Sequence, residues 1–409
     1  MKKILPIFLG VLSAIGGFVD IGDLVANAES GARFGLSLAW VVVVGVIGIV
    51  LYAEMAGRVA AVSGRPTFDL IRERLGARAA FVNLLASFFI NFLTLTAEIA
   101  GIALAILLLT RINYLLLLPF AAFAVWLVIW RVKFERMEEI FGILGLSLLV
   151  FGFAVWKLSP DWTELFHQAV RPTVPSGDGH PTWVFFAIAL FGAAMTPYEV
   201  FFFSSGAVEE RWSDKDLRIN RANVYIGFPL GGALSLFIMA GAAIVLGPLH
   251  VSVSHLSQVA LPVVLGAGKI GLALLCVGLF AATFGAALET GLSAGYAVAQ
   301  FFGWPWGKMR RPTEASRFHL VVLISVVLAA ALGLTAVDPI KVTEYSIVLS
   351  AAALPLTYFP LLVVANDRDY MGDQVNGRFV NGVATVYLVV LSVVAIVTIP
   401  LMIATKAGA

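Results

Sequence analysis

Apolar runs long enough to cross a lipid bilayer follow one another along almost the whole chain. A spanning helix needs about 20 mainly apolar residues, and 60% of the 409 residues are hydrophobic whereas 13% are charged. Soluble domains average about 25% charged residues, so a soluble fold would leave much of this apolar surface exposed to water. The sequence therefore predicts an all-α polytopic membrane protein, with a single transmembrane domain over residues 1–409 and no separate catalytic domain.

We predict eleven spans from this pattern. The N-terminal run is interpreted as the first span and not as a signal peptide, because no convincing cleavage site follows it. The predicted spans are residues 5–32, 36–57, 82–109, 113–131, 139–157, 182–206, 222–247, 268–301, 318–337, 342–365 and 379–404.

The loop charges predict the orientation. With the N-terminus in the cytoplasm, 20 of the 27 Lys and Arg residues fall on the inner side and 7 on the outer side. This excess follows the positive-inside rule, and an odd number of spans places the C-terminus outside. The net charge of +2 and the single Cys276 indicate neither a nucleic-acid partner nor an internal disulfide, and no obligatory protein partner is evident.

The first span carries two carboxylates, Asp20 and Asp23, close to three glycines. Glycine permits the backbone to leave the helix, and a carboxylate at membrane depth costs about 2.5–3.5 kcal/mol on insertion scales. The spans contain no Lys or Arg near mid-membrane that would neutralise the pair. We therefore interpret both carboxylates as groups that bind a cation or line a water-filled cavity.

The sixth span contains Thr196, Pro197 and Glu199. A proline inside a helix removes a hydrogen bond and frees carbonyl groups upstream, here near Ala193. This pattern fits an interrupted helix that binds an ion, and it also fits a simple proline kink.

The positions of the two interruptions favour an ion transporter. Spans one and six correspond in a five-plus-five inverted repeat, in which broken helices hold ions near the membrane midplane. The first repeat would cover residues 5–157, the second 182–365, and the helix at 379–404 would be an addition. We predict this LeuT-like architecture from the positions of the spans.

The candidate ligands are all hard oxygens. Carboxylates, a hydroxyl and backbone carbonyls suit Mg²⁺, Ca²⁺ or Mn²⁺ better than softer metals, and Mg²⁺ keeps several waters when it binds. Met195 is next to Thr196 but should point about 100° away on a helix. The five histidines lie in loops or at span ends.

At these residues the sequence resembles the natural-resistance-associated macrophage protein (NRAMP) family of divalent-metal transporters. Residues 20–23, Asp-Ile-Gly-Asp, stand where the family has Asp-Pro-Gly-Asn, and residues 196–199, Thr-Pro-Tyr-Glu, stand where it has Met-Pro-His-Asn. Further likenesses are Asp-Arg-Asp-Tyr-Met-Gly at 367–372, Leu-Pro at 354–355 and the stretch 94–101. The resemblance covers most of the chain.

The resemblance implies a metal site and also a change in its selectivity. By analogy, Asp20, Asp23, Thr196 and the carbonyl of Ala193 would hold the metal, and Glu199 would attract it. Thr196 replaces a methionine sulfur and Asp23 replaces an asparagine. This pattern is similar to the NRAMP-related magnesium transporters of bacteria, so we expect Mg²⁺, with Mn²⁺ as a further substrate, in a bacterial-type inner membrane. The metal is the substrate, and no cofactor is expected.

The resemblance also implies a changed proton route. The family uses a histidine in span six, here Tyr198, and an aspartate in span three, here Leu95, while Glu98 remains. A tyrosine does not exchange protons near neutral pH as histidine does, so we expect weak or absent proton coupling.

Three further membrane carboxylates, Glu54, Glu289 and Glu344, either line the ion path or cap and pair helices. Glu54 lies four residues before Arg58, a spacing that suits an ion pair.

Three other functions are weighed against magnesium transport. A proton-coupled Mn²⁺ or Fe²⁺ importer would need a softer ligand or a histidine, and Met195 facing the site in place of Thr196 would favour it. A sodium-coupled carrier of organic solutes fits the architecture, but the acidic cluster disfavours an anionic substrate. An intramembrane enzyme would need a nucleophile with its base or metal-binding histidines, and neither is found in the spans.

Overall fold

The structure is a computed structural model that describes residues 10–12, 14–15, 17–174, 179–335 and 338–408. The described residues form helices and loops without a strand. The elements are α2 (Ile21–Phe34), α3 (Ala39–Ser63), α4 (Thr67–Thr110), α5 (Tyr114–Arg131), α6 (Phe134–Gly145), η1 (Leu146–Leu149), α7 (Val150–Leu158), α8 (Trp162–Val170), α9 (His180–Ala194), α10 (Pro197–Glu209), η2 (Asp214–Asp216), α11 (Leu217–Val245), η3 (Gly247–Leu249), α12 (Leu256–Phe302), α13 (Ser316–Leu334), α14 (Pro339–Ala365), α15 (Arg368–Met371), η4 (Gly372–Gln374) and α16 (Arg378–Ala404).

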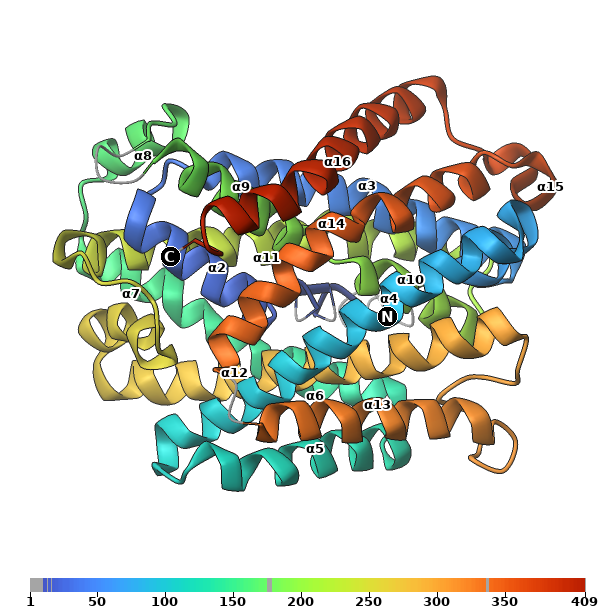
Figure 1. Cartoon of the computed structure of the whole chain (residues 1–409), viewed down its shortest axis with the longest axis horizontal. Coiled ribbons are helices and arrows are strands. Elements are labelled where there is room, and N and C mark those ends of the chain that lie inside the picture. Colours follow the sequence, from blue (N-terminus) through green and yellow to red (C-terminus); the bar gives the residue numbers. More distant parts are fainter. Residues whose placement is uncertain (1–9, 13, 16, 175–178, 336–337, 409) are drawn as a thin grey trace.

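The all-helical membrane architecture is confirmed. Within the described part of the chain, ten helical segments are long and apolar enough to cross a membrane, and they match the second to eleventh predicted spans. The first predicted span, 5–32, begins outside the described residues, and its described part contains α2. Many of the helices run in roughly the same direction (Figure 1).

α4 and α12 each consist of two helical segments that join at a glycine kink. The predicted spans begin at residues 82 and 268, whereas α4 begins at Thr67 and α12 at Leu256. Each helix contains one glycine with positive φ, Gly76 at 83° and Gly268 at 63°, where its direction changes. α4 is the third span and α12 the eighth, so the two occupy equivalent places in the five-plus-five repeat.

The interior has two apolar clusters. The smaller cluster joins α4 and α12 to α5 and α13, and α5 and α13 lie side by side at the bottom of Figure 1. The larger cluster surrounds the interrupted helices and their neighbours α3, α11 and α14. α2 packs so closely on α11 that a Cβ atom on Gly31 would lie 2.2 Å from the carbonyl oxygen of Met239.

Both predicted helix interruptions are present. α9 ends at Ala194 and α10 begins at Pro197, with Met195 and Thr196 outside the helices. Proline suits the first position of a helix because it has no N–H to satisfy. Asp20 has extended backbone angles of −89° and 179° and directly precedes α2. The chain therefore leaves the helical conformation twice inside the domain.

A buried lysine closes the end of α5. Lys308 lies in the loop between α12 and α13, and its Nζ atom donates hydrogen bonds to the carbonyl groups of Ile129, at 2.9 Å, and Val132. Burial lowers the pKa of Lys308 to about 8, although the nearby Glu209 carboxylate acts in the opposite direction. The folded chain therefore releases this proton at a lower pH than the unfolded chain.

This pKa shift predicts a pH dependence of stability. Between about pH 8 and the ordinary lysine value of 10.5, the unfolded chain binds more protons than the folded chain, so the free energy of unfolding should rise with pH. Thermal unfolding of the wild type and of Lys308→Gln between pH 7.5 and 10 measures this dependence of stability on pH. The melting-temperature difference, wild type minus variant, should increase with pH.

The matched control is Lys215→Gln at an exposed position. The prediction fails if the Lys308→Gln difference is as flat with pH as the control difference.

Candidate functional site

The first helix interruption places Asp20 at the N-terminus of α2. Its Oδ1 atom accepts a hydrogen bond of 2.7 Å from the N–H group of Asp23, so Asp20 is the N-cap of this helix. A carboxylate is favourable there because it satisfies a free backbone donor and faces the positive end of the helix dipole. The side chain is only 4% exposed, so this carboxylate lies in the interior of the domain.

Tyr198 connects the two interruptions. It lies in the first turn of α10, and its hydroxyl oxygen is 3.1 Å from Oδ2 of Asp20 and 3.2 Å from the carbonyl oxygen of Gly17. The hydroxyl is a donor toward these acceptors. Tyr198 therefore positions the Asp20 carboxylate from the side opposite to α2.

A small cavity lies between the interruptions. Its volume is about 20 Å³, which holds about one water-sized atom. Three of the predicted ligands, Asp20, Ala193 and Thr196, line it together with Glu98. The other lining residues are Ile21, Gly22, Thr94, Ala97, Gly192, Thr343, Ser346, Ile347 and Ser350.

Glu98 brings a second carboxylate to this cavity from α4. Its Oε1 atom accepts a hydrogen bond of 3.2 Å from the N–H group of Ile21. Its Oε2 atom is buried and has no hydrogen-bond partner. The cavity therefore has two carboxylates, each held by the beginning of α2.

Hydroxyl groups from α4 and α14 complete the polar lining, and the sequence analysis did not identify them as site residues. The hydroxyls of Thr94 and Ser346 are 2.8 Å apart, and Thr343 and Ser350 lie on the same stretch of α14. Thr343, Ser346 and Ser350 are spaced by three and four residues, which places them on one helix face. That spacing in an apolar span is the signal that would have found them.

Asp23 does not line the cavity. Its Oδ2 atom accepts a hydrogen bond of 2.5 Å from the hydroxyl of Ser235 on α11, and its Oδ1 atom accepts one of 2.8 Å from Asn27. These bonds turn the carboxylate toward α11 and away from Asp20. Asp23 therefore joins α2 to α11 in this conformation.

Glu199 and the three further membrane carboxylates have different surroundings. The carboxyl of Glu199 and that of Glu289 on α12 both lie beside Gly17, and neither residue lines the small cavity. Glu54 forms an ion pair with Arg58 at 3.1 Å, so the pairing interpretation fits this residue. Glu344 lines a second and larger pocket.

No basic side chain neutralises the central carboxylates in the described part of the chain. The ion pairs found there involve other acidic groups, and none includes Asp20, Asp23, Glu98 or Glu199. Also among the described residues, no three His, Cys, Asp or Glu side chains form a group that could hold a metal ion. A cation in the small cavity would thus be bound by carboxylates together with neutral oxygens and water.

Thr196, and not Met195, lines the small cavity. The Met195 sulfur packs against α3, where a Cβ atom on Gly48 would lie 2.6 Å from it. The Met195 carbonyl oxygen accepts a hydrogen bond of 3.2 Å from the hydroxyl of Tyr358. Among the described residues that line the cavity there is no methionine, cysteine or histidine.

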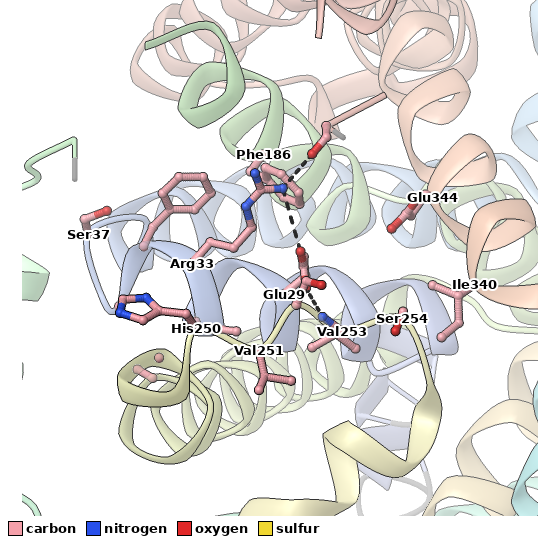
Figure 2. A pocket seen from close by; sticks show the side chains of 18 of the residues that line it. Glu29, Arg33, Ser37, Phe186, His250, Val251, Val253, Ser254, Ile340 and Glu344 are labelled. Carbon is pink, nitrogen blue, oxygen red and sulfur yellow. Dashed lines mark hydrogen bonds and ion pairs between the residues drawn. The ribbon is translucent and has the colours of Figure 1, made fainter. Parts of the chain in front are cut away.

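The large pocket, of about 1120 Å³, lies beyond the C-terminal end of α2. Figure 2 shows Glu29 and Arg33 of α2 on one side of it and Glu344 of α14 on another. Arg33 lies 3.8 Å from the Glu29 carboxylate, whose other oxygen accepts a hydrogen bond from the Val253 N–H group. Along α14, Glu344 lines this pocket whereas the adjacent Thr343 lines the small cavity. The two spaces therefore neighbour each other.

Polar contacts tie the helices together at the opposite end. Arg58 donates hydrogen bonds to the carbonyl group of Gln374 and to the side chain of Asn376. Arg74 forms an ion pair with Asp367 at 2.6 Å. These contacts connect α3 and α4 to the segment between α14 and α16.

The family model described as "Natural resistance-associated macrophage protein-like" matches residues 10–400. A divalent metal cation transporter, MntH, of Klebsiella pneumoniae is 27% identical over 387 residues, which cover 90% of this chain and 87% of that protein. The protein of the same name from Pectobacterium carotovorum is 26% identical, with 94% and 91% covered.

Solved structures agree in fold. A mutant of the Eremococcus coleocola manganese transporter superimposes with a TM-score of 0.76 at 20% sequence identity and covers 99% of this chain and 88% of its own. A Na⁺-coupled sialic acid symporter superimposes with a TM-score of 0.64 at 13% identity, covering 96% and 89%. The likeness to both confirms the predicted LeuT-like architecture.

The contact between Asp23 and Ser235 gives a stability prediction. Ser235→Ala removes a donor from a carboxylate that is 1% exposed, and leaving a buried polar group unsatisfied costs about 1–3 kcal/mol. Thermal unfolding in detergent should therefore occur at a lower temperature than in the wild type. Ser392→Ala is the control, because that serine bonds only a carbonyl of its own helix. Equal melting temperatures for the two variants would contradict this role of Ser235.

Proposed function

The chain belongs to the natural resistance-associated macrophage protein-like family of metal-ion transporters, and on that premise we propose that it imports a divalent cation, most favourably Mg²⁺, with weak or no proton coupling. The relatives named as divalent metal or manganese transporters make Mn²⁺ the second candidate substrate. The family consists of transporters and not of enzymes, and the metal is its substrate.

The main support for the magnesium proposal is the chemistry of the residues that line the small cavity. Asp20, Glu98, Thr196 and neighbouring hydroxyls offer only oxygen atoms, and the Met195 sulfur packs elsewhere. Oxygen ligands favour hard cations, whereas a thioether favours softer metals. A site of this chemistry binds abundant hard ions without discriminating in favour of transition metals.

The cavity volume indicates how the ion enters. About 20 Å³ is too small for a cation with a full shell of waters, and Mg²⁺ releases its waters reluctantly. We propose that the ion loses part of its hydration at Asp20, or that the cavity widens when α2 and α10 move. The large pocket beside Glu29 and Glu344 would then be the entrance.

The orientation follows from the predicted loop charges. With the N-terminus in the cytoplasm, the large pocket opens to the outside, and the contacts of Arg58 and Arg74 close the inside. We propose that this is an outward-facing conformation. An inside-negative potential then drives uptake, at about 2.3 kcal/mol per charge per 100 mV.

Two features support weak proton coupling. Tyr198 takes the place of the histidine that the resemblance assigns to proton transfer, and its hydroxyl is engaged with Asp20. Leu95 is fully buried in an apolar cluster, so this position offers no group that exchanges protons.

Uptake into proteoliposomes tests the proposal. With Mg²⁺ and pH indicators inside and a negative potential imposed, Mg²⁺ should enter without acidification. Asp20→Asn should reduce the uptake at least about tenfold, because losing about 1.4 kcal/mol of binding has that effect, while asparagine still caps α2. The exposed Glu314→Gln is the control.

Two other outcomes would reject magnesium transport. Mn²⁺-driven acidification without Mg²⁺ entry would identify a proton-coupled transition-metal importer. If neither ion enters, the sodium-coupled carrier of organic solutes becomes the better hypothesis.

Thr196 provides a test of selectivity. Thr196→Met introduces a sulfur where the cavity has a hydroxyl, so uptake of Cd²⁺ relative to Mg²⁺ should increase severalfold. Thr196→Val removes the hydroxyl without adding sulfur and should lower Mg²⁺ uptake with no gain for Cd²⁺. If both variants change the Cd²⁺ to Mg²⁺ ratio alike, the proposed role of residue 196 is wrong.

A further inference from the structure

A second pair of buried carboxyls lies near the small cavity but outside it. Glu199 in the first turn of α10 is 2% exposed, and Glu289 in the middle of α12 is 7% exposed. The ends of the two side chains meet beside Gly17. Two carboxylates this close in a low-dielectric interior repel each other strongly, and a cation between them would relieve that repulsion.

Both carboxyls point at the same place. A Cβ atom added to Gly17 would lie 2.5 Å from Oε2 of Glu199 and 2.6 Å from Oε2 of Glu289. The Glu199 Oε2 atom is buried and accepts no hydrogen bond. Because Gly17 has no side chain, carboxyl oxygens from α10 and α12 approach one point beside its backbone.

The pair lies on the far side of Asp20 from the large pocket. Gly17 precedes the interruption of the first span, whereas Glu29 and Arg33 of the large pocket follow it. The Tyr198 hydroxyl lies between Asp20 and Gly17, since it is within 3.2 Å of both the Asp20 carboxylate and the Gly17 carbonyl oxygen. An ion leaving Asp20 away from the large pocket therefore meets Glu199 and Glu289.

We propose that Glu199 and Glu289 form a second binding position for a divalent cation, a relay between the Asp20 cavity and the end of the helices at which Arg58 and Asp367 lie. The inference rests on the proposed function, because it concerns the same ion on the same path. Two carboxylates with retained waters are a ligand set that Mg²⁺ and Mn²⁺ accept. The charge of the two carboxylates together matches that of one divalent cation.

Equilibrium binding of Mn²⁺ to the purified full-length chain in detergent tests the relay. The signal of free Mn²⁺ in electron paramagnetic resonance counts unbound ion, and Mg²⁺ serves as the competitor. The measurement uses Asp20→Asn as the background, because that variant weakens the first position and keeps the helix cap. Glu289→Gln is then added to it, with Glu314→Gln as the matched control.

We expect the Asp20→Asn chain to keep one weaker Mn²⁺ site that Mg²⁺ displaces. Adding Glu289→Gln should weaken the remaining binding more than tenfold, and adding Glu314→Gln should leave it unchanged. Gly17→Ala in the same background is a second variant that fills the point between the oxygens and keeps both carboxyls. The variant should still fold, because the flexible carboxyl ends can move to admit the methyl group. The methyl group should also weaken the remaining Mn²⁺ binding, because it occupies the point where the ion would lie. Thermal unfolding checks that each variant is folded.

Three results would overturn the relay. Binding by the Asp20→Asn chain that survives both Glu289→Gln and Gly17→Ala would place the second ion elsewhere. A wild type that binds one Mn²⁺ and an Asp20→Asn chain that binds none would leave only the Asp20 position. A wild type that binds no Mn²⁺ or Mg²⁺ would reject the proposed function together with the relay, so the two failures are distinguishable.

Discussion

Carboxylates buried in a membrane domain without a basic partner are the constraint on which this structure depends. Isolated charges in a low-dielectric interior are costly unless hydrogen bonds or an opposite charge compensate them. Nearby groups donate hydrogen bonds to these carboxylates. Backbone N–H groups at the start of α2 donate to Asp20 and Glu98. The side chains of Ser235 and Asn27 donate to Asp23. Oxygens of Glu98 and Glu199 remain without a donor. The compensation is thus incomplete, and this makes the centre of the domain a place where a cation is favourable.

The interrupted helices make that arrangement available. A continuous helix would use its backbone N–H and carbonyl groups internally, whereas the interruptions at Asp20 and at Met195–Thr196 free some of them inside the domain. The helix N-terminus faces the carboxylates with its positive end. α4 and α12 pack along each other beside these segments, and each contains a glycine kink. In transporters with this arrangement, the interrupted helices hold the ion, and one group of helices moves as a body against the other.

The chemistry of the small cavity depends on which of two neighbouring side chains faces it. Thr196 presents an oxygen, while the Met195 sulfur packs near Gly48 of α3. A change at one position would therefore alter the ligand chemistry without altering the fold. The carboxylates also have separate roles: Asp20 and Glu98 belong to the small cavity, Asp23 joins two helices, and Glu54 forms an ion pair.

The sequence by itself determined the membrane architecture and the two interruptions, because length, hydropathy and the Pro197 and glycine positions are local properties of the chain. It also singled out the polar side chains of Asp20 and Thr196 beside the interruptions and the carbonyl of Ala193 upstream of Pro197, and the family resemblance pointed to Glu98. Only the tertiary structure decided that Asp23 turns toward Ser235, that Glu199 meets Glu289 beside Gly17, and that hydroxyls of Thr94 and Ser346 reach the cavity. The contact between Thr94 and Ser346, for example, joins residues 252 positions apart. The direction of a side chain depends on which helix packs against it, and no pattern along a single helix records that partner.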